Sequence, residues 1–173
     1  NAPWYQHEEL GYNYRMSNLI AGVLRGQLPY LEDHIRAKKA VYERYRDGLK
    51  DLPITMNPFD KENSQPNFWL SCMLINSEAM CKQVRSEHEA LYIKEHRKSC
   101  PTEILEAIAS INAEGRPIWK PMHMQPLYQR NGFVRGSTVD VGADIFQRGL
   151  CLPSDNKMTI QQLKYVLTVA ESG

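Results

Sequence analysis

Residues 67–75 read NFWLSCMLI, an almost continuous apolar run bounded by turn-forming residues. Its aromatic and β-branched content predicts a strand in the core of the protein. Because apolar and polar residues do not alternate along it, we expect the strand to be buried on both faces.

A long amphipathic helix is expected before this strand. Ser17 or Asn18 is a suitable N-cap, since a short polar side chain can accept a bond from a free backbone amide. Apolar residues then recur at three- and four-residue spacing, which is typical of one buried helix face. These residues are Leu19, Ile20, Val23, Leu24, Leu28, Leu31 and Ile35.

Pro29 falls inside this helical pattern. It has no backbone N–H to donate, so a kink or break is expected near Leu28. The apolar pattern then resumes through Leu49, and the helix is expected to end within residues 50–52.

The rest of the chain alternates between short strands and helices. The expected elements are a strand at 54–56 within the loop 53–66, a charged helix over 77–98, an amphipathic helix from Pro101 to Gly115, a short helix over 142–150, a strand over 150–154, and a last helix over 158–171 opened by Thr159. This order predicts an α+β fold in which helices cover a small sheet.

Composition excludes several classes of protein. The 173 residues are 42% hydrophobic and 24% charged, which suits one globular domain with a real core. Twenty-one Lys and Arg balance twenty Asp and Glu, and the scattered cations predict no nucleic-acid or membrane partner. No apolar run is long enough to span a bilayer, so a cytoplasmic protein is expected.

The four cysteines follow no metal-binding or disulfide pattern. Cys72, Cys81, Cys100 and Cys151 are too widely and irregularly spaced for a CxxC knuckle or a dense disulfide framework. Free and mostly buried thiols in a reducing compartment are therefore expected.

Residues 116–126, RPIWKPMHMQP, combine two cations, an indole and an imidazole with three prolines. The prolines fix the backbone, so Arg116 and Lys120 can meet phosphate or carboxylate, Trp119 a ring, and His123 a hydroxyl or carbonyl. The alternative is structural: Trp119 and Met122 belong to the core, Arg116 makes a surface ion pair, and His123 is a satisfied buried imidazole.

Residues 11–18, GYNYRMSN, place amides, phenols and a guanidinium ahead of the long helix. Free amides and the helix dipole favour an anion at such a position. The alternative is that the asparagines make local turn and cap bonds while Tyr12 and Tyr14 pack. His88 and His96 have no evident further ligands, so a solvated helix face is favoured over a metal site.

Four segments together resemble one enzyme family. GYNYRMSN, NFWLSCMLI, AEGRPIWKPMHMQP and RGLCLPS occur in the order found in the C-terminal portion of the DegT/DnrJ/EryC1/StrS sugar aminotransferases, which use pyridoxal phosphate. The similarity spans essentially the whole chain. It implies that residues 1–173 are the small C-terminal domain of a fold-type-I aminotransferase, with the active sites at a homodimer interface.

The resemblance also implies roles for individual residues. Asn13 matches the asparagine that reaches the cofactor phosphate in the partner subunit, and Tyr14 and Arg15 flank it in a crossing loop formed by residues 1–16. The substrate side is implied for Arg116, Trp119, Lys120 and His123. Members of this family transfer an amino group, usually from glutamate, to a keto-sugar nucleotide.

The chain departs from the family by what it lacks. Relatives are about twice as long, and their Schiff-base lysine, and with it the large cofactor-binding domain, lies before the point that matches Asn1. The sequence also begins without an initiator Met, so a piece of a longer protein is expected. We therefore expect no catalytic residue and no bound cofactor or metal in this chain alone, and no activity.

Two other interpretations remain open at this stage. The chain could be a non-enzymatic derivative of the family that acts in binding, regulation or oligomerisation, or an unrelated small α+β ligand-binding domain. If the large domain is absent, the apolar face of the first helix is expected to be exposed and to promote association between copies.

Overall fold

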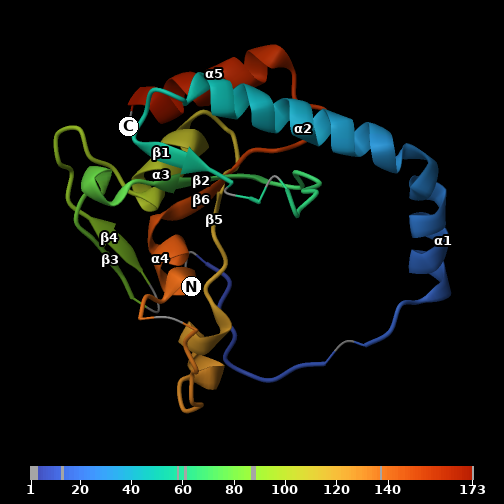
Figure 1. Ribbon diagram of the computed structural model, residues 1–173, viewed down its shortest axis with the longest axis horizontal. Helices are drawn as coiled ribbons and strands as arrows, with labels where there is room; N and C mark the ends of the chain where they lie inside the picture. Colours follow the sequence, from blue (N-terminus) through green and yellow to red (C-terminus); the bar gives the residue numbers. More distant parts are fainter. Residues whose placement is uncertain are drawn as a thin grey trace.

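The structure is a computed structural model that describes residues 4–12, 14–57, 59–60, 62–86, 89–136 and 138–172. A four-stranded antiparallel sheet forms its centre (Figure 1). In spatial order, its strands are β1 (Ile54–Met56), β2 (Ser71–Ile75), β6 (Gly149–Leu152) and β5 (Arg116–Pro117). The expected α+β class and the small helix-covered sheet are confirmed.

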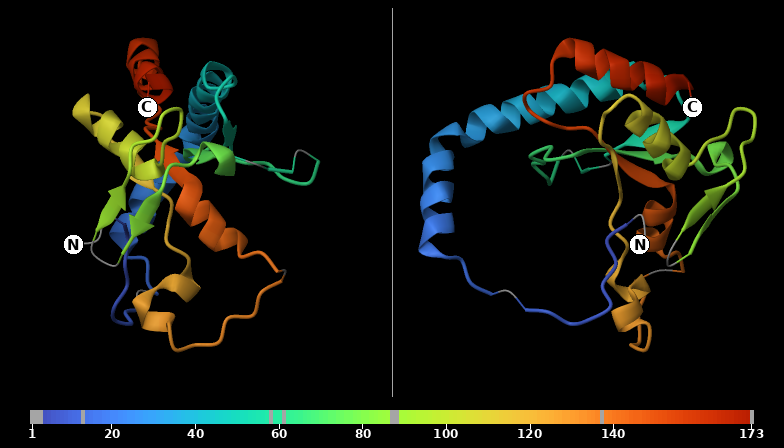
Figure 2. Two further views of the ribbon diagram at one scale, coloured as in Figure 1. Left: turned by 90° about the vertical axis from the view of Figure 1, so that its left-hand side faces the viewer. Right: turned by 180° about the vertical axis from the view of Figure 1, so that it is seen from behind.

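Three helices cover one face of this sheet: α2 (Leu31–Gly48), α3 (Pro101–Ser110) and α5 (Ile160–Ser172). In Figures 1 and 2, α2 and α5 lie side by side over the strands. The core between these layers is formed by Val41, Tyr45, Leu49, Met73, Ile75, Ala79, Ile104, Ile108, Leu150, Leu152, Leu163 and Val166. Register explains this set, because Met73 of β2 aligns with Leu150 of β6 and the two side chains share a face.

The second face of the sheet carries α4 (Val141–Arg148), and a separate two-stranded ribbon packs against α4 and α3. The ribbon consists of β3 (Gln83–Arg85) and β4 (Ala90–Tyr92). Its side chains bond to the end of α4: Gln83 Nε2 donates to the carbonyl of Gln147 at 2.7 Å, and Arg85 Nη1 donates to that of Phe146 at 2.5 Å.

The long helix breaks where Pro29 predicts. α1 (Asn18–Gln27) ends, a 3₁₀ turn η1 (Leu28–Tyr30) follows, and α2 continues in a new direction (Figure 1). Ser17 is the N-cap, accepting from the Ile20 amide at 3.3 Å. The prediction that this helix buries its apolar face is wrong for α1, which has no buried residue. The reason is that the turn at Pro29 directs α1 away from the body of the protein.

The largest error concerns residues 77–98, where the residues that the structure describes form no long helix. A 3₁₀ turn η2 (Ser77–Ala79) leads into the β3–β4 ribbon, closed by bonds such as Ile93 N to Lys82 O at 2.9 Å. The physical reason is that this segment has only a weak apolar face: Val84 and Leu91 remain exposed on the ribbon, so a helix would have had little to bury. His88 lies outside the described residues.

Other elements agree with expectation except at their ends. The strand at 54–56 and the helices near 142–150 and 158–171 are confirmed as β1, α4 and α5, and the strand near 150–154 as β6. The strand expected over 67–75 begins only at Ser71, because Phe68 adopts a positive φ of 52°. Its burial alternates, with one face in the core and the other partly exposed.

The helix expected to run from Pro101 to Gly115 ends at Ser110 instead, and α2 ends at Gly48 rather than within 50–52. After α3, Asn112 takes the left-handed conformation, with φ 57°, that commonly follows the end of a helix. Gly115 instead lets the backbone pass close to β6, since a Cβ there would lie 3.1 Å from the carbonyl oxygen of Cys151. Among the described residues, no helix is long and apolar enough to cross a membrane.

Candidate functional site

The cationic and aromatic segment begins as the edge strand β5. Arg116 aligns with Cys151 and Pro117 with Leu150 of β6. Pro117 is tolerated there because an edge strand does not need every backbone donor. Beyond β5 the chain leaves the sheet and forms two short turns, η3 (Met122–Met124) and η4 (Pro126–Tyr128). We call residues 116–126 the strip.

Three aromatic rings stand in a row over the strip. The ring centroids of Tyr5 and Trp119 are 6.3 Å apart with planes inclined by 12°, and those of Trp119 and Trp69 are 5.8 Å apart at 33°. Each of these side chains is between 44% and 62% exposed, so ring surface remains open to solvent. The core alternative for Trp119 is therefore not what the structure shows. We call these three residues the aromatic row.

Arg116 lies at one end of this row. Its Nη1 donates to the Tyr5 hydroxyl at 2.6 Å, and its Nε and Nη2 bond Glu114 Oε1 at 2.9 and 2.8 Å. The bond with Glu114 is also the main reason why the pKa of Arg116 is raised. The surface ion pair of the structural alternative is thus present, and it keeps the cation beside the rings.

Gln125 attaches the N-terminal segment to the strip. Its side chain is 2% exposed; Nε2 donates to the carbonyls of Tyr5 and Lys120, at 3.2 and 3.0 Å, and Oε1 accepts from the His7 amide at 3.0 Å. A further bond joins Leu127 N to His7 O at 3.3 Å. Since a buried amide that satisfies three backbone groups is costly to remove, Gln125 holds Tyr5 in the aromatic row.

His123 is held from two sides. Its Nε2 is 2.7 Å from Asp140 Oδ2, and the Phe133 ring stacks on the imidazole with centroids 3.8 Å apart and planes 4° apart. Asp140 also caps α4 by accepting from the Ala143 amide at 3.0 Å. The hydrogen bond from the Ala143 amide is the main reason why the pKa of Asp140 is lowered, and the contact with His123 lowers it further. Because a carboxylate only accepts, Nε2 carries the proton, and Nδ1 is the nitrogen that a ligand would meet.

The end of the crossing loop, at Tyr14 and Arg15, lies apart from the strip. Asn13 is outside the described residues. Tyr14 is 85% exposed, and its ring lies 5.7 Å from that of Tyr12, which is 69% exposed. Arg15 is exposed as well. Tyr14 and Arg15 shortly precede α1, and Figure 1 shows α1 well away from β5, so the structure does not bring these two residues together with the strip residues.

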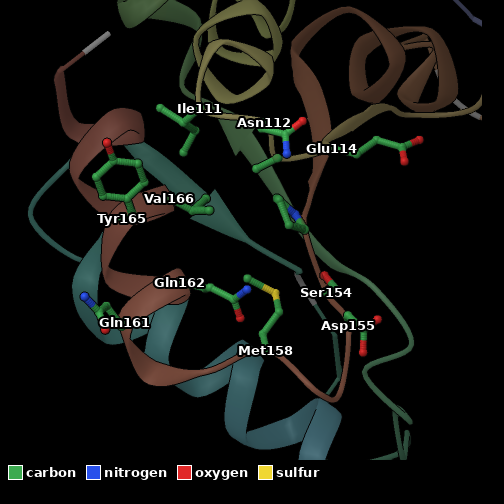
Figure 3. Close-up of a pocket in the computed structure, with 12 residues that line it drawn as sticks. Ile111, Asn112, Glu114, Ser154, Asp155, Met158, Gln161, Gln162, Tyr165 and Val166 are labelled. Carbon is green, nitrogen blue, oxygen red and sulfur yellow. The ribbon is translucent and has the colours of Figure 1, made fainter.

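A pocket lies away from the strip, between the end of α3 and α5. It has a volume of about 630 Å³ and is lined by none of the residues singled out in the strip or the crossing loop. Figure 3 shows Gln162 and Val166 of α5, with Met158 from the loop before this helix, on one side and Asn112 and Ser154 on the other. Gln162 is already used in capping α5, because its Oε1 accepts from the Thr159 amide at 2.9 Å.

Comparison with known proteins gives a consistent result. The family model described as the DegT/DnrJ/EryC1/StrS aminotransferase family matches residues 1–170. The chain belongs to this family.

Individual relatives agree with the family match. EpsN of Bacillus subtilis (strain 168), provisionally named a pyridoxal phosphate-dependent aminotransferase, is 31% identical over 95% of this chain. GDP-perosamine synthase of Vibrio cholerae is 25% identical over 94% of it. In both cases the chain spans 38% of the length of the relative.

A solved structure shows the same fold. Helicobacter pylori PseC, an aminotransferase involved in the biosynthesis of pseudoaminic acid, aligns with a TM-score of 0.68 at 16% identity, over 95% of this chain and 39% of its own. The resemblance to part of a DegT/DnrJ/EryC1/StrS aminotransferase is thereby confirmed, and an unrelated small domain is excluded.

Family members bind pyridoxal phosphate, and the described residues fit only one end of that group. Arg15 supplies a cation, and Tyr14 a phenol, immediately before the N-terminus of α1, a donor set that suits a phosphate. Both side chains are exposed, and α1 has no buried residue to form a wall for a pyridine ring. The fit is to the phosphate alone.

Sequence reasoning missed the residues that complete the strip. Tyr5, Trp69, Gln125, Phe133 and Asp140 all contact the expected residues. Trp69 gave the only available signal: it is a large aromatic residue next to the turn that opens the central strand. Tyr5, Phe133 and Asp140 are joined to the strip by tertiary contacts that no spacing reveals, and the role of Gln125 within the strip depends on its bonds to the distant Tyr5 and His7.

Proposed function

We propose that this chain is the substrate-side and dimer-forming portion of a pyridoxal phosphate-dependent aminotransferase that acts on a nucleotide-linked keto-sugar, with glutamate as the amino donor, in the cytoplasm. The aromatic row with its attached cation carries this proposal. A nucleotide sugar joins a flat base, a diphosphate and a polar ring, and the strip offers a matching partner for each.

The aromatic row would hold the flat part of the ligand. Trp69 is 62% exposed and Trp119 44% exposed, so an added ring has a face on which to stack. Stacking of this kind tolerates different bases. The name of the Vibrio cholerae relative favours a GDP-linked sugar.

Arg116 and Lys120 would meet the diphosphate. A phosphate can replace Glu114 on the guanidinium, because both are oxyanions that accept from the same fork of donors. Lys120 is partly buried, and its own carbonyl is fixed by Gln125, so the position of its stem is defined. His123, oriented by Asp140, would accept from a sugar hydroxyl through Nδ1.

Asn13, Tyr14 and Arg15 would hold the phosphate of the cofactor in the active site of the partner subunit. When bound, pyridoxal phosphate supplies an electron sink for the substrate carbon that gains or loses the amino group. The residues of this chain would bind and orient the two phosphate-bearing molecules. The lysine that anchors the cofactor is expected outside the chain, so we propose that the chain alone is inactive.

Ligand binding tests the strip. Titration of UDP- and GDP-sugars should quench tryptophan fluorescence, and Trp119→Ala should weaken binding by about tenfold or more, as expected for loss of one stacked ring. Lys120→Ala should weaken the binding of nucleotide sugars but not that of the free sugar. Lys157→Ala, on the exposed loop before α5, should leave the binding of both unchanged. Equal affinity of the wild type and Trp119→Ala would refute the substrate role of the aromatic row.

Borohydride reduction tests the cofactor statement separately. After addition of pyridoxal phosphate and borohydride, intact mass should show no stoichiometric adduct on this chain. A stoichiometric adduct on Lys120 would instead make the short chain a complete enzyme.

A further inference from the structure

Two cysteines face each other across the central pair of strands. Cys72 of β2 and Cys151 of β6 are directly opposite in the register, and their sulfur atoms lie 3.5 Å apart. Both thiols are free. Neither has a part in the proposed binding of cofactor or substrate.

The register at this point suits a covalent link. The Cys72 carbonyl accepts from the Asn57 amide at 3.0 Å, and the Cys72 amide donates to Asn57 Oδ1 at 2.6 Å, so both backbone groups point away from β6. Cys72 and Cys151 are therefore a non-hydrogen-bonded pair, for which the Cα separation is about 4.5 Å. Disulfides span Cα separations of about 4.4 to 6.8 Å, so the sheet need not move.

Access is unequal for the two thiols. Cys72 is partly exposed and lines a small cavity of about 60 Å³ together with Ile118, Ile145 and Gly149, whereas Cys151 is 2% exposed. The hydrogen bond with Cys151 lowers the pKa of Cys72 against the opposing effect of burial; the same bond and burial raise the pKa of Cys151, with Arg116 opposing. These differences assign attack to Cys72 and resolution to Cys151.

We propose that Cys72 and Cys151 form a peroxide-reactive dithiol site that closes to a cross-strand disulfide. In the first step Cys72 Sγ attacks one oxygen of hydrogen peroxide, the O–O bond breaks, and water leaves with the thiol proton, giving a sulfenic acid. In the second step Cys151 Sγ attacks Cys72 Sγ, the S–O bond breaks, and a second water leaves with the proton of Cys151. Two thiols are oxidised and one peroxide is reduced to two waters.

The size of the cavity favours a small oxidant. A volume of about 60 Å³ accommodates a molecule of the size of hydrogen peroxide but not a tripeptide disulfide. The new bond would lie beneath the strip, because Ile118 lines the same cavity and Arg116 is paired with Cys151.

The chain contains its own matched control. Cys81 and Cys100 are a second pair in side-chain contact, but they are only 4% and 0% exposed, and burial raises the pKa of Cys81 to about 12. The two sulfur atoms of this pair are close together but solvent hardly reaches them. The pair should therefore react with peroxide at least roughly tenfold more slowly than Cys72 and Cys151 do.

Peptide mapping of the purified chain tests the proposal. The reduced protein is treated with hydrogen peroxide, remaining thiols are alkylated, and digestion without reductant is followed by mass spectrometry. We expect a linked peptide pair containing Cys72 and Cys151 with loss of two hydrogen atoms, while Cys81 and Cys100 are recovered as thiols alkylated after unfolding. This measurement needs no variant, so a folding defect cannot produce the result.

Two variants then assign the roles. In Cys72→Ser, Cys151 should stay reduced at the same peroxide concentration, because it is buried and has lost its attacking partner. In Cys81→Ser, the 72–151 linkage should form at the wild-type rate. Over-oxidation of Cys72 to sulfinic acid with Cys151 still reduced would overturn the proposal, as would linkage of Cys81 to Cys100 at an equal rate. Neither outcome bears on nucleotide-sugar binding, so the two proposals can fail independently.

Discussion

Gly149 joins α4 to β6 at a point where a side chain has no space. A Cβ there would lie 2.6 Å from the carbonyl oxygen of Ile145 and 2.7 Å from Ile118 Cγ1. The first of these contacts is with backbone and cannot be relieved by a rotamer change.

Gly149→Ala should therefore reduce the free energy of unfolding by about 1 to 3 kcal/mol, the usual range for overpacking. Gly142→Ala at the start of α4 is the matched control, since its nearest contact would be an ordinary 3.4 Å from Pro121. Urea unfolding of both variants measures the difference, and equal midpoints would show that β6 can shift to make room.

Acid should weaken the contacts around His123 through Asp140. The pKa of this carboxyl is lowered by the Ala143 amide and further by His123. A group with a depressed folded pKa stabilises the fold above its unfolded pKa, and this contribution is lost as pH falls through the folded value. The loss should therefore occur below about pH 4, near the ordinary pKa of aspartate.

Asp140→Asn removes the titration but keeps an oxygen that can cap α4. Its urea midpoint should change less between about pH 6 and about pH 3 than that of the wild type. The exposed Asp51→Asn should behave as the wild type does. A variant with the full wild-type pH dependence would place the acid sensitivity at other carboxyls, such as Asp144, whose pKa is lowered by Arg148.

At the scale of elements, α1 is unusual because its apolar residues are uncovered. Leu19, Ile20, Val23 and Leu24, together with Leu28 of the turn η1 that follows, are between 49% and 77% exposed. An exposed apolar stripe of this kind promotes association.

The purified chain should therefore form larger species as its concentration rises, and Leu24→Glu should shift it towards the monomer. Gln27→Glu adds the same charge outside the apolar set and should not. Size-exclusion chromatography with light scattering gives the mass directly. A clean wild-type monomer at high concentration would contradict the expectation.

Sequence predicted those elements that carry a strong local signal. Pro29 broke the helix where it should, and Ser17 capped α1, because both effects act within one turn. Residues 77–98 were assigned the wrong structure, since their pairing as a ribbon depends on bonds to α4 such as that from Arg85. The same limit applies to the site: Trp119 and His123 were identifiable, but Gln125 and Asp140 gained their roles from distant partners.

At the scale of the whole molecule, truncation of a side chain to alanine should affect the free energy of unfolding differently in the core and on the exposed helix α1. Ile108 is fully buried between α3 and the sheet, whereas Leu19 on α1 is 77% exposed.

Ile108→Ala should lower the free energy of unfolding by about 2 to 5 kcal/mol. Leu19→Ala should change it by about 0.5 kcal/mol or less. Chemical denaturation at low protein concentration, where association is negligible, compares them. Similar losses in both variants would mean that α1 packs on the body in solution.

The pairing of β2 with β6 has a consequence for the way the chain acquires its fold. These central strands are joined through residues 76–148, so their contact requires closure of a very long loop, whereas the β3–β4 ribbon and α3 need only local chain. During synthesis, β2 gains this neighbour only after residues 149–152 have been made. Until then the apolar side of α2 has no complete sheet to cover it, and a nascent chain stalled before residue 149 should be held by chaperones or cleaved by proteases.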